Sequence, residues 1–114
     1  MLNLISGLES ISQLNLEVDQ EVNLLEGITF ENGTSFVKMQ IEKDGQTTDI
    51  PDPQHFVPDT PGTCNIILVV KDFEGKTVEF KVENLTIKAV EYQAMVINYL
   101  QPKEILPIVG KINV

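Results

Sequence analysis

The sequence predicts an all-β domain, a sandwich of stacked antiparallel sheets with about seven strands, from three observations. Short segments alternate apolar and polar residues, as half-buried strands do. Turn-forming residues separate these segments, so that strands recur about every 8–12 residues. The 114 residues are 42% hydrophobic and 22% charged, which is the composition of one globular domain with a core of its own.

Three strands are predicted in the first third of the chain. Residues 14–18 alternate apolar and polar side chains, residues 22–25 resume the pattern after an acidic break, and residues 28–30 follow a Glu-Gly turn. Residues 31–34 contain the Asn32-Gly33 pair, which accepts positive φ angles cheaply and therefore predicts a tight turn.

The next strand ends in a second tight turn. Val37, Met39 and Ile41 are expected on one face, with lysine, glutamine and glutamate alternating on the other. Residues 43–46, Lys-Asp-Gly-Gln, predict a hairpin. The loop after this hairpin is expected to be irregular because proline cannot donate to a sheet ladder, and its prolines are Pro51, Pro53, Pro58 and Pro61. Phe56 is expected to anchor this loop in the core.

The most apolar strand is predicted at residues 64–71. Its inward face consists of alternate residues, namely Cys64, Ile66, Leu68 and Val70. Ile67 and Val69 on the opposite face are also apolar, which predicts a central strand covered on both sides.

A four-residue hairpin loop, residues 72–75, leads into the return strand, because Gly75 accepts a left-handed conformation. The inward residues of that strand are Val78, Phe80 and Val82. After Asn84 the alternation shifts by one position, so that Leu85 and Ile87 become the apolar pair. A shift of one residue predicts a β-bulge near Asn84.

The tail leaves two pairs of alternatives open. Residues 91–100 fit a short helix or another strand, and Pro102 and Pro107 interrupt the last part of the chain. The remaining apolar residues need a partner, and they are Ile105, Leu106, Ile108, Val109 and Ile112. They either cover Ile67 and Val69 on the outer sheet face or form the opening strand of a following module.

Two stretches resemble the bacterial immunoglobulin-like (Big-type) domains of surface and secreted proteins. Residues 16–28 (LEVDQEVNLLEGI) are similar to that family's strand, acidic turn and valine-polar-leucine-leucine-x-glycine motif. Residues 59–66 (DTPGTCNI) and 70–77 (VKDFEGKT) are similar to its Thr-Pro-Gly-Thr-Tyr strand start and its Asp-x-x-Gly-Asn hairpin. The likeness spans residues 14–88, and Cys64 stands where the family usually has tyrosine.

The resemblance implies an immunoglobulin-like antiparallel β-sandwich over residues 1–88. Residues 89–114 are then an irregular or extra-strand C-terminal extension, or the start of a following module. It also implies a spacer or adhesion module at the cell surface, in the periplasm or outside the cell, with neighbouring domains in a longer chain. Met1 to Ser6 lack the basic start and long apolar stretch of a secretion signal, so the protein is either cytosolic or the mature part or a fragment of a longer chain, and we expect the second.

Charge and hydropathy argue against two classes of partner. The net charge is −9, and all eight basic residues are lysines, so the guanidinium fork that reads guanine edges and phosphates is missing. Seventeen carboxylates would repel a nucleic-acid backbone, and we expect no nucleic-acid partner. No apolar run approaches the ~20 residues of a membrane helix, so we expect no membrane insertion.

The residues predict no enzyme, no cofactor and no zinc site. His55 is the only histidine and Cys64 the only cysteine, too few for structural zinc, and no nucleophile motif accompanies His55. Cys64 lies in an apolar alternation and is expected to be buried. Two acidic pairs are the candidates for weak calcium binding, namely Asp49 with Asp52 and Asp72 with Glu74.

The predicted function is therefore that of a non-catalytic spacer or adhesion module, with a protein or a glycan as partner. The alternative is an accessory carbohydrate-binding domain of a surface glycan-handling protein. Sugars stack on exposed aromatic rings, and the candidates are Tyr92, Tyr99 and Phe73.

Overall fold

The computed structural model of the chain describes residues 3–90. This part contains seven strands and two short 3-10 helices. In chain order they are β1 (Ile5–Ser6), η1 (Leu8–Gln13), β2 (Leu16–Glu17), β3 (Thr29–Phe30), β4 (Ser35–Lys43), β5 (Gln46–Ile50), η2 (Pro53–His55), β6 (Gly62–Lys71) and β7 (Thr77–Lys88). The strands form two sheets, which confirms the predicted all-β class.

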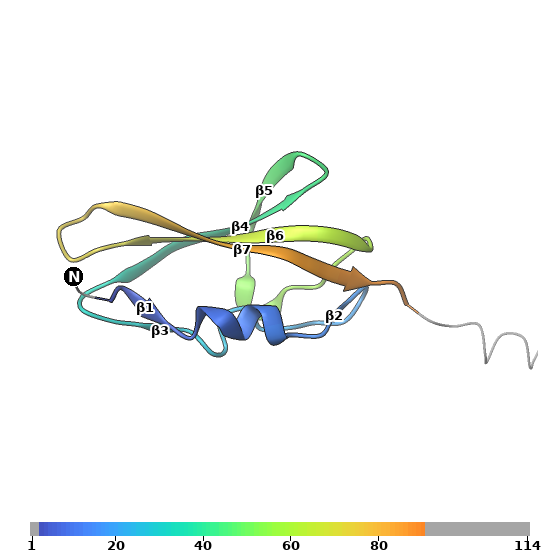
Figure 1. Cartoon of the computed structure of the whole chain (residues 1–114), viewed down its shortest axis with the longest axis horizontal. Coiled ribbons are helices and arrows are strands. Elements are labelled where there is room, and N and C mark those ends of the chain that lie inside the picture. Colours follow the sequence, from blue (N-terminus) through green and yellow to red (C-terminus); the bar gives the residue numbers. More distant parts are fainter. Residues whose placement is uncertain (1–2, 91–114) are drawn as a thin grey trace, which may run out of the picture.

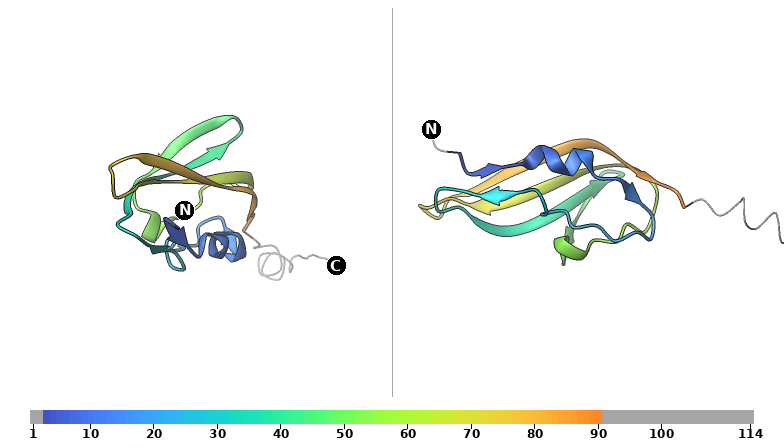
Figure 2. Two further views of the ribbon diagram at one scale, coloured as in Figure 1. Left: turned by 60° about the vertical axis from the view of Figure 1, so that its left-hand side comes forward. Right: turned by 90° about the horizontal axis from the view of Figure 1, so that it is seen from below.

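The two sheets differ in size. Five strands form one sheet in the order β2-β7-β6-β4-β5, and β1 pairs with β3 in the other. The small sheet, η1 and the β5–β6 connection lie below the large sheet and form the second layer (Figures 1 and 2). Neighbouring strands are antiparallel except β2 and β7, which run parallel and so differ from the expected arrangement.

Strand β6 is the centre of the large sheet, as predicted. It pairs with β4 on one side and with β7 on the other. Leu68 and its inward neighbours Ile66 and Val70 are fully buried. On the outer face, Ile67 and Val69 are only 7% and 2% exposed. Polar residues of the two neighbouring strands stand opposite them in the ladder, namely Gln40, Lys81, Lys38 and Glu79.

The predicted bulge in β7 is confirmed. Cys64 pairs with Leu85 and Ile66 pairs with Val82, so that two residues of β7 stand opposite the single residue Asn65. Asn84 takes the left-handed conformation, with φ 61°, and its N–H donates to Oδ1 of Asn65 at 3.0 Å. The extra residue keeps Leu85 and Ile87 buried on the inner face.

The prediction that Val37 faces inward is wrong, because β4 contains a second bulge at this residue. The register of β4 against β6 shifts between Phe36 and Lys38, and Val37 is 41% exposed. Phe36 pairs with Val70 instead and stacks edge-on against Phe30 of β3, with ring centroids 6.3 Å apart. The rest of the strand keeps the predicted alternation.

Residues 22–25 do not form the predicted strand. Only Val22 makes a bridge, to Phe56. Oδ1 of Asn23 accepts the N–H of Leu25 at 3.0 Å, a local bond that favours a turn. The N–H of Leu24 donates to the carbonyl of Pro53 at 2.8 Å, and the leucine side chain is buried in the core. The strand predicted at residues 14–18 is likewise shorter, since β2 holds only two residues.

The two predicted tight turns have different roles. Asn32 and Gly33 have φ angles of 55° and 76°, but β3 and β4 belong to different sheets, so this turn passes from one layer to the other. Asp44 and Gly45, with φ angles of 55° and 79°, join β4 to β5 as the predicted hairpin. The tail alternatives for residues 91–114, including Tyr92 and Tyr99, lie outside the described residues.

Candidate functional site

A cleft of about 380 Å³ lies between the β4–β5 hairpin and the connection from β5 to β6. The hairpin rises away from the plane of the large sheet (Figure 1). The proline-rich connection runs in the second layer, so the two layers separate at this edge. The lining residues are Ile41, Lys43, Thr48, Asp49, Ile50, Pro51, Asp52, His55, Phe56, Val57, Pro58, Asp59, Thr60 and Ile87.

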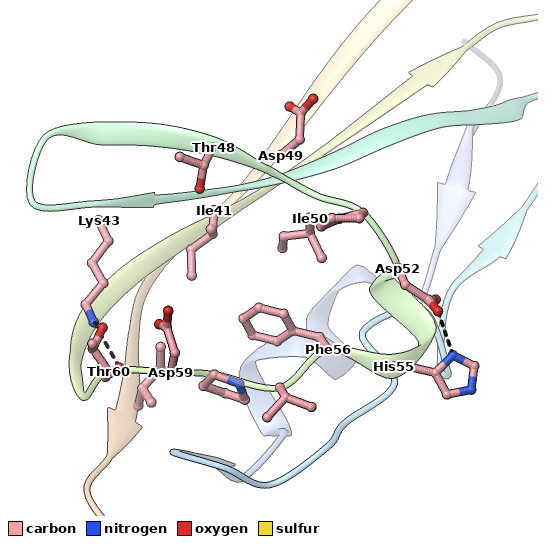
Figure 3. A pocket seen from close by; sticks show the side chains of 14 residues that line it. Ile41, Lys43, Thr48, Asp49, Ile50, Asp52, His55, Phe56, Asp59 and Thr60 are labelled. Carbon is pink, nitrogen blue, oxygen red and sulfur yellow. Dashed lines mark hydrogen bonds and ion pairs between the residues drawn. The ribbon is translucent and has the colours of Figure 1, made fainter.

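The floor of the cleft is apolar. The side chains of Ile41, Ile50 and Phe56 point into the space between the layers (Figure 3). Phe56 is held in place because its N–H donates to the carbonyl of Val22 at 2.9 Å and its carbonyl accepts the N–H of Val22 at 2.8 Å. It packs on the core but stays half-exposed, so the predicted aromatic anchor also lines the cleft.

A lysine closes one end of the cleft. Nζ of Lys43 donates to the carbonyl of Thr60 at 2.9 Å and also contacts the hydroxyl of this threonine. The contact ties the β4–β5 hairpin to the strand connection across the opening. Asp59 directs its carboxylate toward the cleft beside this contact, as Figure 3 shows.

The other charged groups lie around the rim. Asp52 and His55 pair with each other at 3.1 Å, from Oδ2 to Nδ1, and both side chains are exposed. Asp49 points away from the cleft and accepts a hydrogen bond from Gln40 at 2.9 Å (Figure 3). An apolar group flanked by polar or basic atoms therefore fits this cleft best.

The structure does not bring the acidic candidates together as a metal site. Asp49 is bonded to Gln40 and Asp52 to His55, so the two carboxylates have separate partners. Oδ1 of Asp72 accepts hydrogen bonds from the N–H groups of Glu74 and Lys76 at 2.9 and 2.8 Å. This oxygen therefore stabilises the β6–β7 hairpin loop. Among residues 3–90, no cluster of three or more histidine, cysteine, aspartate or glutamate side chains could hold a metal ion.

In the described part of the chain, two ionisable groups have perturbed pKa values, and both shifts have structural causes. Burial raises the pKa of the Cys64 thiol, although the charge of Lys43 opposes the effect. Hydrogen bonds from Asn65 and Lys81 to Glu42 hold the pKa of this partly exposed carboxyl below its ordinary value. Neither group lies in the cleft. Cys64 is thus a buried core residue, as expected.

Most of the cleft has no signal in the sequence. His55, Asp49 and Asp52 stand out there only as single ionisable residues, and nothing distinguishes Ile41 or Asp59 from other strand and loop residues. Their placement depends on the packing of β5 over the proline-rich connection, which no local pattern encodes. The aromatic candidate Phe73 lies away from the cleft, 65% exposed at the tip of the β6–β7 hairpin.

Comparison with models of known families, with curated proteins and with solved structures finds no match for this chain. In the part that the structure describes, no helix has both the length and the apolar character needed to cross a membrane.

Proposed function

We propose that this chain is a non-catalytic, immunoglobulin-like spacer or adhesion module of a bacterial surface or secreted protein. One observation carries the proposal. The described chain begins beside the β6–β7 hairpin and leaves β7 at the opposite end of the long axis (Figure 1). Neighbouring modules joined at such ends would continue along one line, so that each copy adds its full length to a stalk.

The sequence resemblance supports the same class and an extracellular, cell-surface or periplasmic location. Sandwich folds host many functions, so the fold alone does not identify the function. The proposal therefore depends more on the ends and edges of the domain. The cleft also supports a binding rather than a catalytic role. It offers an apolar floor with a few polar groups at its rim, including the exposed Asp52–His55 pair, and this is the usual composition of a ligand pocket.

The parallel pair of β2 and β7 suits a module that carries tension. Leu16 pairs with Ile87 and Glu17 with Lys88, and the N–H of Val18 donates to the carbonyl of Lys88 at 2.9 Å. Both strands run in the same direction. Tension between residues 3 and 90 therefore draws them past each other and loads these hydrogen bonds together.

Replacing Val18 by proline is expected to weaken the domain under tension. Val18 is the second residue of the turn in which Gln20 N–H donates to Glu17 O, a position that proline favours. The change removes the hydrogen bond to Lys88 and lowers the free energy of unfolding by about 0.5–1.5 kcal/mol. Single-molecule pulling from residues 3 and 90 should show a lower rupture force.

Val22→Pro is the matched control, because it also removes one N–H donor, the one that bonds the Phe56 carbonyl. The two variants are compared after chemical denaturation has measured the unfolding free energy of each. At equal loss of stability, only Val18→Pro should lower the rupture force. Equal rupture forces for both variants, or a wild type that extends at forces too low to measure, would contradict a tension-bearing spacer.

One observation favours the carbohydrate-binding alternative. Phe73 presents an open aromatic ring at a hairpin tip, where a sugar face can stack. In this case Phe73→Ala should abolish retention on a glycan array. The control is Val37→Ala, which also truncates an exposed apolar side chain but lies outside the cleft, and it should not change retention. Absence of retention of the wild type across bacterial and host glycans would exclude the alternative.

A further inference from the structure

Strand β5 is an edge strand, and half of its backbone groups face away from the sheet. It is the last strand in the order of the large sheet, so no strand of residues 3–90 pairs with its outer side. The residues that flank its two-residue turn form a hydrogen-bonded pair, and the pattern then alternates. Thr48 and Ile50 therefore bond to β4, whereas Thr47 and Asp49 direct their N–H and C=O groups outward.

The side chains of β5 alternate between the cleft and the outer face. Thr48 lines the cleft, whereas Asp49 points away from it (Figure 3). Residues directly opposite each other in an antiparallel pair have side chains on the same face. A segment whose backbone bonds to Thr47 and Asp49 therefore places its intervening residue opposite Thr48, with the side chain on the side of the cleft. Addition of a strand to an open sheet edge is a general mode of peptide recognition.

One carboxylate inside the cleft has no cationic partner within residues 3–90. Three carboxylates line the cleft, and two of them are bonded to a glutamine and a histidine. The third, that of Asp59, is directed toward the cleft (Figure 3) and takes part in no ion pair of residues 3–90. The ammonium group of Lys43 at the end of the cleft donates to the carbonyl of Thr60 instead. The charge of Asp59 is thus available to a cation that enters the cleft.

This carboxylate and β5 belong to the same opening. A smaller hollow of about 230 Å³ adjoins the cleft at the β4–β5 turn, and Ile41, Thr48 and Asp59 line both spaces. Thr48 bounds the opening on the side of β5, and Asp59 bounds it on the side of the strand connection. A long side chain that enters beside Thr48 can therefore contact the half-buried Ile41 and Phe56 and end at the carboxylate.

We infer that the cleft receives an arginine side chain of a different protein, presented by an extended segment that adds to β5. The methylene stem of arginine covers apolar surface, and its planar, weakly hydrated head forks onto a carboxylate and stacks on an aromatic ring. Asp59 and Phe56 offer these two partners.

The composition of this chain excludes a second copy as the source of the arginine. All eight basic residues are lysines, and the net charge of −9 makes two copies repel each other. The same acidity attracts a basic segment of another protein. The inference rests on the adhesion role proposed above, for which it names the class of partner.

Fluorescence anisotropy of labelled peptides with the full chain tests this inference. The probe is the peptide Thr-Val-Thr-Arg-Thr-Val-Thr, whose arginine stands between the two threonines that would bond to Thr47 and Asp49. The matched probe carries citrulline in place of arginine, which keeps the shape of the side chain and removes its charge. The arginine probe should bind, and the citrulline probe should bind about fivefold more weakly or worse.

Three variants of the protein separate the contributions. Asp59→Asn should weaken binding of the arginine probe about fivefold and leave the citrulline probe nearly unchanged. Glu74→Gln removes one negative charge from an exposed residue of the β6–β7 hairpin, and this control should change neither. Thr47→Pro removes an outward N–H, keeps the ladder with β4 and should abolish binding of both probes. Urea denaturation checks that each variant is folded.

Each part of the inference has its own contrary result. No binding of the arginine probe to the wild type would overturn the whole. Equal affinity for both probes, or equal effects of Asp59→Asn and Glu74→Gln, would overturn recognition of arginine. Full binding by Thr47→Pro, or equally tight binding of N-acetylarginine amide, would overturn strand addition. Tighter binding of the same peptide with lysine in place of arginine would assign the cleft to lysines, which this chain itself contains.

The spacer role is tested separately. The pulling experiment on Val18→Pro measures resistance to tension and uses no peptide, whereas the peptide experiment applies no force. Loss of one result therefore leaves the other intact, and the two failures can be told apart.

Discussion

Replacing Leu68 by alanine is expected to lower the free energy of unfolding by about 2–5 kcal/mol. Leu68 is fully buried at the centre of β6, where it pairs with Met39 and Phe80 in the neighbouring strands. These strands flank it and the second layer covers it, so the cavity left by the lost side chain cannot close easily. Domains of this size have total stabilities of about 5–15 kcal/mol, and the variant will be close to unfolding at 37 °C.

Ile67→Ala provides the matched comparison, one position along the same strand and on the opposite face. Ile67 is almost as well buried, but within residues 3–90 no second sheet lies above it, and the flexible side chains of Gln40 and Lys81 stand beside it. These side chains can close over the gap, so we expect a loss of about 1–2 kcal/mol. Urea denaturation measures both values. A larger loss for Ile67→Ala would mean that the principal core lies on the outer face.

Deleting Asn84 is expected to leave the domain folded, whereas deleting Lys81 from the same strand is expected to unfold it. Asn84 is the extra residue of the bulge, and its removal leaves Glu83 opposite Asn65 and Leu85 opposite Cys64 in a regular ladder. The cost is the hydrogen bond to Asn65, about 0.5–1.5 kcal/mol, partly offset by the loss of a positive-φ residue.

Deletion of Lys81 has the opposite consequence because the strand has no spare residue there. If the bulge takes up the shortening, Val82 turns outward and the charged Glu83 turns inward opposite the fully buried Ile66, since side chains alternate strictly. If the bulge is kept, Leu85 and Ile87 turn to the wrong face instead. Circular dichroism and thermal melting should show a cooperative transition for the first deletion and none for the second. If both deletions melt alike, Asn84 is not the extra residue of the strand.

Local patterns in the sequence determined the all-β class, the central position of β6, its hairpin with β7 and the bulge at Asn84. Each depends on neighbouring residues: strict alternation, a glycine that accepts positive φ, and a visible shift of polarity after Asn84. The bulge at Val37 produces no such shift, because Phe36 and Val37 are both apolar and either fits the inward position. Both bulges insert one extra residue into a strand, but only the bulge at Asn84 changes the polarity pattern, and only Asn84 has a positive φ.

Only the tertiary structure decided which strands become neighbours. A period of two indicates a strand but does not encode its partner, so the parallel pairing of β2 with β7 and the passage of the Asn32-Gly33 turn between sheets had no local signal. The cleft arises in the same way, since Ile41 and Phe56 approach each other only when β4 and the proline-rich connection stack in separate layers. Long-range packing selects such contacts, because burial rewards any apolar partner that fits, whatever its distance along the chain.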